Sequence, residues 1–135
     1  YDLSTKFISK VEDYPTGHVN VSKDKDVQLS YIIHRPAAYD FPSLTYHQID
    51  DIISFEPDWI YFGTVQQMSV VAREITNKII QMLPQIRVFY DINLREGHYT
   101  KDLIKKLLMA SSILKLNIEE IKICNELFEK KNDAI

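Results

Sequence analysis

Glycine is scarce in this chain, and its scarcity excludes the common nucleotide-binding motifs. Only three of the 135 residues are glycine, namely Gly17, Gly63 and Gly97. Neither the G-x-G-x-x-G fingerprint of dinucleotide-binding folds nor the G-x-x-x-x-G-K-S/T phosphate loop can be built from glycines so far apart. The sequence therefore contains no standard dinucleotide or P-loop site.

Cysteine, excess positive charge and long apolar runs are also lacking. The single cysteine, Cys124, cannot form an internal disulfide, which suits a reducing, cytoplasmic setting. The 16 basic residues are outnumbered by 19 acidic ones, so we expect no nucleic-acid binding through bulk electrostatics. No run of about 18 apolar residues occurs, so no membrane span is expected either.

Apolar residues are abundant, and they follow two different periods. They make up 45% of the chain, which is enough for a packed core. Within residues 1–44 they alternate with a period of two over 7–11, 18–22 and 28–34, which predicts a small antiparallel meander. Over residues 45–135, helical patterns alternate with short apolar runs at 59–63, 87–92 and 112–116. This second pattern predicts an α/β body with parallel strands.

The helical patterns each carry an apolar face. One helix is predicted over 68–82 and ends before Pro84, and the next has its apolar positions at 103–108. In the last helix, Ile121, Cys124, Leu127 and Phe128 are predicted to face inward. We interpret these faces as core rather than as cofactor sites.

Two of the predicted strands end in polar side chains, where open parallel sheets place their ligand crevice. After the first come Asp91, Asn93 and Arg95. The arginine fork suits a carboxylate, a phosphate or a pair of sugar hydroxyls, and the other two side chains can exchange hydrogen bonds with hydroxyls. An equally weighted interpretation is that Asp-x-Asn only shapes a turn while Arg95 lies in solvent.

The second cluster contains Lys115, Asn117 and Glu120. On spacing alone, Asn117 and Glu120 are best interpreted as the N-cap and N3 residues of a capping box, and Gln would serve equally well at N3. A helix N-terminus is also an anion site, so a phosphate and a hydrated magnesium ion could be held there. Lys115 adds a point charge or is simply a surface lysine.

Four short segments, in this order, resemble the ribokinase-like (PfkB) carbohydrate kinases, with fructokinase-type members nearest. They are residues 14–19 (YPTGHV), 34–40 (HRPAAYD), 91–95 (DINLR) and 115–120 (KLNIEE). A further match, 61–64 (YFGT), falls at a predicted strand end. The resemblance implies an ATP-dependent transfer of phosphate to a sugar hydroxyl. It also implies part of a doubly wound α/β body with a small antiparallel β lid over the sugar.

The resemblance assigns roles to residues in both parts of the chain. It implies that the substrate lies near Asp91, Asn93, Arg95, Gly63 and Ala37, with Thr16, Gly17 and Ala38 also shaping the sugar side. Asn117 and Lys115 are implied on the phosphate side, and Glu120 is implied to hold Mg²⁺ through water. The partners implied are a small sugar and ATP. The resemblance leaves open whether two copies pair through the lid.

Two motifs of that family are not found in this sequence. They are the amino-terminal sugar motif with glycine and asparagine, and the carboxyl-terminal Gly-x-Gly-Asp segment that supplies the anion hole and the catalytic base. No catalytic residue is therefore assigned here. The chain is interpreted as the central fragment of a fructokinase-like kinase. The alternative is a non-catalytic binding or assembly module that keeps the kinase-like fold.

We expect the 135-residue chain alone to show no sugar-dependent ATP hydrolysis and no sugar phosphorylation above a no-protein control. Phosphoryl transfer depends on positioned donors that stabilise the developing charge, and the segment that would supply them is missing. A coupled assay with D-fructose and ATP checks this. Fructose phosphate that rises in proportion to the amount of chain would contradict it.

Overall fold

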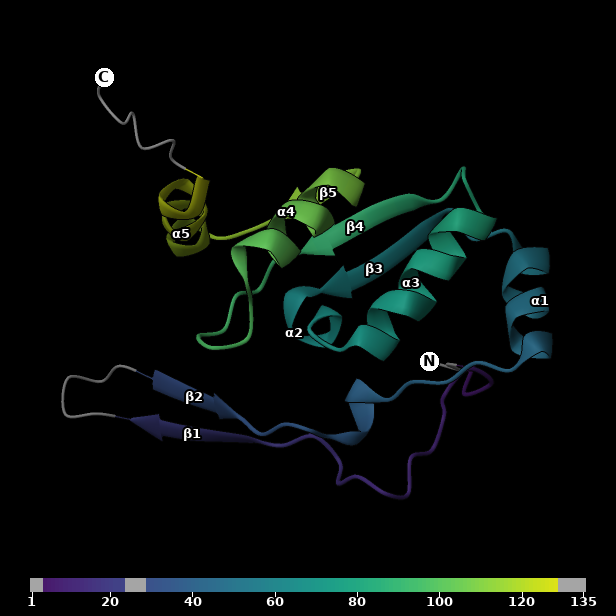
Figure 1. Cartoon of the computed structure of the whole chain (residues 1–135), viewed down its shortest axis with the longest axis horizontal. Helices are drawn as coiled ribbons and strands as arrows, with labels where there is room; N and C mark the ends of the chain where they lie inside the picture. Colours follow the sequence, from purple (N-terminus) through teal and green to yellow (C-terminus); the bar gives the residue numbers. More distant parts are fainter. Residues whose placement is uncertain (1–3, 24–28, 129–135) are drawn as a thin grey trace.

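The structure is a computed structural model that describes residues 4–23 and 29–128. It has the predicted mixed α/β architecture, with two separate sheets (Figure 1). Strands β1 (Val19–Lys23) and β2 (Leu29–Ile33) form an antiparallel hairpin, which we call the lid after the role that the resemblance implies. Strands β3 (Trp59–Gly63), β4 (Arg87–Asp91) and β5 (Ile113–Lys115) form a parallel sheet in the order β3-β4-β5.

The lid contains two of the three predicted strands. Val19 pairs with Ile33 and Lys23 with Leu29, as the alternating pattern indicated, although position 28 lies outside the described residues. The strand predicted over 7–11 is wrong. Its beginning is a turn, in which the Ile8 N–H donates to the Thr5 carbonyl at 3.0 Å. This segment is held near helix α1 (Tyr46–Phe55) instead of beside the lid, because Gln48 Nε2 donates to the Lys6 carbonyl at 2.7 Å.

Serine and threonine caps set where the body helices begin. Thr100 caps α4 (Lys101–Ala110) by accepting the Leu103 N–H at 3.2 Å. Ser69 caps α3 (Val70–Met82) in the same way, so the single helix predicted over 68–82 is wrong at its start. Short helix α2 (Thr64–Gln67) precedes this break. The remaining helical segments are the 3₁₀ turn η1 (Ala38–Asp40) and α5 (Ile118–Phe128).

One face of the parallel sheet carries the core. Val88, Tyr90 and Ile92 alternate along the segment that starts with β4, and they pack in one cluster with Leu103 and Ile104 of α4. Side chains of α5 also pack against this cluster. On the opposite face, Tyr61 and Ile113 are exposed. The described part of the sheet is therefore covered on one face only.

A buried hydroxyl network fixes the carboxyl ends of β3 and β4. The Thr64 hydroxyl donates to the Ile92 carbonyl, so the Tyr90 hydroxyl donates to Thr64 Oγ1 at 2.7 Å. Burial raises the pKa of Tyr90 to about 12, which keeps its hydroxyl protonated as a donor. The strand end that carries the Asp91–Arg95 motif is thus held against the start of α2.

The described helices are too short or too polar to span a bilayer; the longest, α3, has 13 residues.

We predict that Ile104→Ala lowers the free energy of unfolding by roughly 2–5 kcal/mol, because it opens a cavity in the core cluster. Ile104 is 0% exposed in the cluster between α4 and the sheet. Met109→Ala, on the same helix but 81% exposed, is the matched control and should change little. Urea unfolding of both variants checks this. Equal losses would contradict the assignment of the core face of α4.

Candidate functional site

A hollow lies between the lid and the carboxyl ends of β3 and β4. Its volume is about 460 Å³, and parts far apart in the sequence meet around it. The lining residues come from the lid, η1, α2 and the loop after β4: Val19, Ile33, Tyr39, Val65, Gln66, Asn93 and Arg95. We call this space the lid hollow. It contains two of the side chains that the sequence analysis proposed for a sugar.

The loop after β4 turns sharply to bring Asn93 and Arg95 to this place. Asn93 has a φ of 37°, in the left-handed region that asparagine tolerates better than most residues. Leu94 is buried, and Arg95 Nη1 donates to the Leu94 carbonyl at 2.9 Å. The Arg95 guanidinium also lies 5.5 Å from the ring centroid of Tyr31 on β2, within cation–π range. Through this contact Arg95 connects the loop after β4 to strand β2 of the lid.

Tyr39 is a lining residue that the sequence analysis did not propose. Its ring lies so close to Gly17 that a Cβ at Gly17 would be 2.5 Å from Tyr39 Cε1. The absence of a side chain at Gly17 thus makes room for this ring. Within the described residues the buried Tyr39 hydroxyl has no hydrogen-bond partner, and burial raises its pKa. The signal in the sequence that could have indicated Tyr39 is its position between Ala38 and Asp40, within the segment 34–40 that resembles the carbohydrate kinases.

Asp91 and Lys115 lie outside the lid hollow. Asp91 Oδ2 accepts hydrogen bonds from Lys115 Nζ at 2.7 Å and from the Tyr61 hydroxyl at 3.1 Å. The hydrogen bond to Asp91 raises the pKa of Lys115 and that of Tyr61. Gly63 pairs with Asp91 in the sheet register, and a Cβ on it would lie 3.3 Å from the Asp91 carbonyl. The structure therefore separates Asp91 from Asn93 and Arg95.

Asn117 and Glu120 form the capping box that their spacing indicates. The Glu120 N–H donates to Asn117 Oδ1 at 2.9 Å, and the Asn117 N–H donates to Glu120 Oε2 at 2.8 Å. The other carboxylate oxygen, Oε1, accepts the Leu94 N–H at 2.9 Å. Glu120 is 6% exposed. It therefore connects the start of α5 to the loop that carries Asn93 and Arg95.

These contacts bear on the implied magnesium ion. Each oxygen of Glu120 accepts one backbone N–H, so one lone-pair site on each oxygen is already used for a contact within the chain. Over the described ranges, no three His, Cys, Asp or Glu side chains gather into a group that could hold a metal ion. The water-mediated role of Glu120 stays a prediction.

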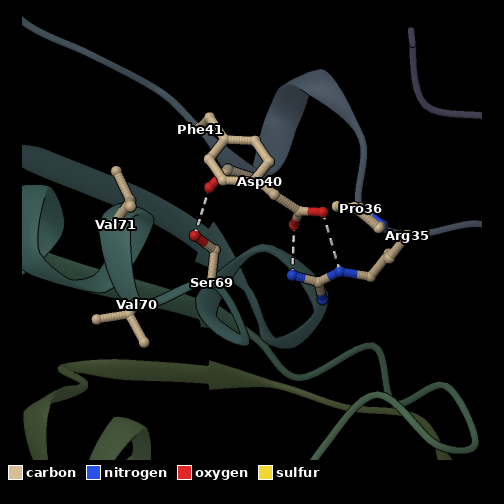
Figure 2. A pocket seen from close by; sticks show the side chains of 7 residues that line it. All are labelled: Arg35, Pro36, Asp40, Phe41, Ser69, Val70 and Val71. Carbon is tan, nitrogen blue, oxygen red and sulfur yellow. Dashed lines mark hydrogen bonds and ion pairs between the residues drawn. The ribbon is translucent and has the colours of Figure 1, made fainter. Parts of the chain in front are cut away.

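A second hollow, also of about 460 Å³, lies where the lid joins the body (Figure 2). Its polar side chains are engaged with one another. Arg35 donates to both carboxylate oxygens of Asp40, and the Ser69 hydroxyl donates to the Asp40 carbonyl. The rest of the lining is apolar: Pro36, Phe41, Val70 and Val71. We interpret this hollow as structural, because no polar side chain in it is left to bind a hydroxyl.

The Arg35–Asp40 pair fixes the position of both the lid and α2. Arg35 Nη1 also donates to the Val65 carbonyl at 2.7 Å, and Val65 lines the lid hollow. Asp40 Oδ2 accepts the Ala37 N–H at 3.0 Å, so Ala37 is buried behind the pair. Ala38 donates its N–H to the Pro15 carbonyl at 2.9 Å, which holds the segment next to Thr16 against η1. Thr16, Ala37 and Ala38, which the resemblance placed near the substrate, thus help to shape the lid hollow but do not line it.

Comparison with known proteins supports the fold. Neither a scan against protein-family models nor a search of curated proteins gave a match. The chain is similar to the solved structure of ribokinase from Giardia lamblia, with a TM-score of 0.51 and 11% sequence identity. The match covers 89% of this chain and 40% of ribokinase. At this identity the likeness shows the fold alone: the chain has a ribokinase-like fold and spans well under half of the ribokinase length.

We predict that Asp40→Ala lowers the free energy of unfolding by roughly 3–5 kcal/mol, because it leaves the Arg35 charge largely buried without its partner. The side chains of the pair are 17% and 6% exposed. Asp51→Ala is the matched control: it breaks the exposed ion pair with Lys6 and should cost no more than about 1 kcal/mol. Chemical denaturation measures the free energy of unfolding of both variants. If Asp40→Ala lowers it by no more than the control does, the Arg35–Asp40 pair does not anchor the lid.

Proposed function

We propose that this chain forms the lid and the sugar-binding side of an ATP-dependent sugar kinase of the fructokinase type. The observation that carries the proposal is the lid hollow. Asn93 and Arg95, which the sequence resemblance places at the sugar, lie there together with residues of the lid and of α2. The ribokinase-like fold supports the same class of enzyme.

The lid hollow has the chemistry that a sugar requires. Asn93 and Gln66 offer amide donors and acceptors, and Arg95 offers a fork of donors that suits adjacent hydroxyls. Val19, Ile33 and Val65 provide apolar walls for the carbon-bound hydrogens of the ring. The volume of about 460 Å³ lies in the range typical of small-molecule sites.

The phosphate side is proposed at the start of α5. Asn117 and the first turn of α5 present a helix N-terminus, which favours anions, and Lys115 adds a positive charge nearby. ATP would supply the phosphoryl group, and Mg²⁺ would accompany it. The catalytic base is proposed to lie in sequence that this chain does not contain, since the chain spans 40% of the ribokinase length.

Pairing of two copies through the lid belongs to the same proposal. Val21 and Ile32, on the two faces of the hairpin, are exposed apolar residues that do not line the lid hollow. Exposed apolar side chains on one small element are typical of a surface that a partner covers.

We predict that the chain binds D-fructose or D-ribose weakly, and that Arg95→Met weakens this binding about tenfold or more. The change removes the guanidinium but keeps the side-chain stem, so hydrogen bonds from a charged donor are lost. NMR titration of each sugar, with neither nucleotide nor metal present, measures the affinity.

Arg87→Met is the matched control for this experiment. Arg87 lies at the other end of β4, where its guanidinium stacks 4.1 Å from the ring centroid of Trp59. Its replacement should leave sugar binding unchanged. If the unaltered chain binds neither sugar, or if both arginine variants lose affinity equally, the proposed sugar site is wrong.

A further inference from the structure

The Glu120 carboxylate serves two separate loops. Its Oε2 accepts the N–H of Asn117, at the start of its own helix, and its Oε1 accepts the N–H of Leu94, in the loop after β4. The distances are 2.8 and 2.9 Å, and the side chain is buried. Both of its partners are donors. Only a carboxylate, which accepts on both oxygens, satisfies them together.

A second capping box in the same chain shows what a simple cap requires. At the start of α1, Gln48 Oε1 accepts the Thr45 N–H at 2.8 Å, while Gln48 Nε2 donates to the Lys6 carbonyl at 2.7 Å. That position needs one acceptor and one donor, which an amide provides. Position 120 needs two acceptors. The expectation that Gln would serve equally well at position 120 overlooked the N–H of Leu94.

The backbone of Leu94 carries this contact toward the lid hollow. Its N–H, in the peptide group shared with Asn93, is held by Glu120. Its carbonyl, in the peptide group shared with Arg95, accepts the hydrogen bond from Arg95 Nη1. On its other side lies Asn93, in a left-handed conformation that needs support from its surroundings. Asn93 and Arg95 are the residues on either side of Leu94, so a shift of the Leu94 backbone would move both polar residues of the loop that line the hollow.

We propose that Glu120 is a positioning residue for sugar binding: its carboxylate holds the Leu94 N–H, fixes the Leu94 backbone and thereby places Asn93 and Arg95. The inference rests on the proposed sugar site. It gives Glu120 a role that needs neither nucleotide nor metal. It also makes the start of α5 and the lid hollow parts of one hydrogen-bonded unit. A movement at the start of α5, on the proposed phosphate side, would therefore shift the residues on the proposed sugar side.

The test compares Glu120→Gln with the unaltered chain in buffer with EDTA and without nucleotide. The amide cannot accept from both N–H groups, so the Leu94 N–H should lose protection from hydrogen exchange. Affinity for D-fructose and D-ribose in NMR titration should fall roughly threefold to tenfold, as expected for one lost hydrogen bond. If Glu120 acted only through magnesium, sugar affinity without metal would not change.

Two further variants keep the test decisive. Thr45→Ala removes the cap of α1, far along the chain from position 120, and controls for general loss of stability. It should lower the thermal midpoint without changing sugar affinity. Glu120→Asp keeps the negative charge with a side chain that is one methylene shorter. It should weaken sugar binding as well, because it cannot reach both loops.

The outcomes separate this inference from the proposed function. If the unaltered chain binds neither sugar, the proposed function is wrong and the positioning role is lost with it. If the unaltered chain binds a sugar and both Glu120 variants bind it equally well, only the positioning role is wrong. Weaker binding by both Glu120 variants, with Thr45→Ala unchanged, supports the inference. A fall in affinity with Thr45→Ala as large as with Glu120→Gln overturns it.

Discussion

The geometry of the lid depends on the buried ion pair between Arg35 and Asp40. Arg35 follows β2 and Asp40 closes η1, so the pair fixes the lid hairpin to the segment that leads into the body. The same guanidinium holds the Val65 carbonyl, and the Ser69 hydroxyl holds the Asp40 carbonyl. A two-stranded hairpin is marginally stable by itself in water. Its position over the strand ends therefore comes from these charged and hydrogen-bonded anchors.

The polar residues at the strand ends lie in two different places. Asp91 and Lys115 pair on the face of the sheet that lies opposite the core, whereas Asn93 and Arg95 reach the lid hollow after the left-handed turn at Asn93. Glu120 accepts the N–H of Asn117, two residues after Lys115, and the N–H of Leu94, next to Asn93. This arrangement makes the loop after β4 the physical link between the proposed sugar side and the proposed phosphate side.

The errors of the sequence analysis have identifiable physical causes. Residues 7–11 alternate like a strand, but a turn and contacts with α1 hold the start of that segment instead. The apolar pattern of 68–82 continues through Ser69, where hydrogen bonds to Ala72 and Asp40 divide two helices. Ile121, predicted to face inward, is exposed, while its neighbours Ile123 and Cys124 pack against the core. In the first two cases a contact from elsewhere in the chain outweighed a local pattern.

Local sequence determined the α/β class, the parallel strands with their order along the chain, and the cap at Asn117, because these follow from periodicity and from hydrogen bonds between near neighbours. Tertiary structure decided which polar residues share a site. Tyr39 joins Asn93 and Arg95 only because the lid folds over the strand ends, whereas Asp91 does not line the hollow and instead pairs with Lys115. The second partner of Glu120 is 26 residues away, a separation that no local pattern encodes. Side-chain spacing fixes contacts within one element, whereas contacts between elements depend on how the whole chain packs.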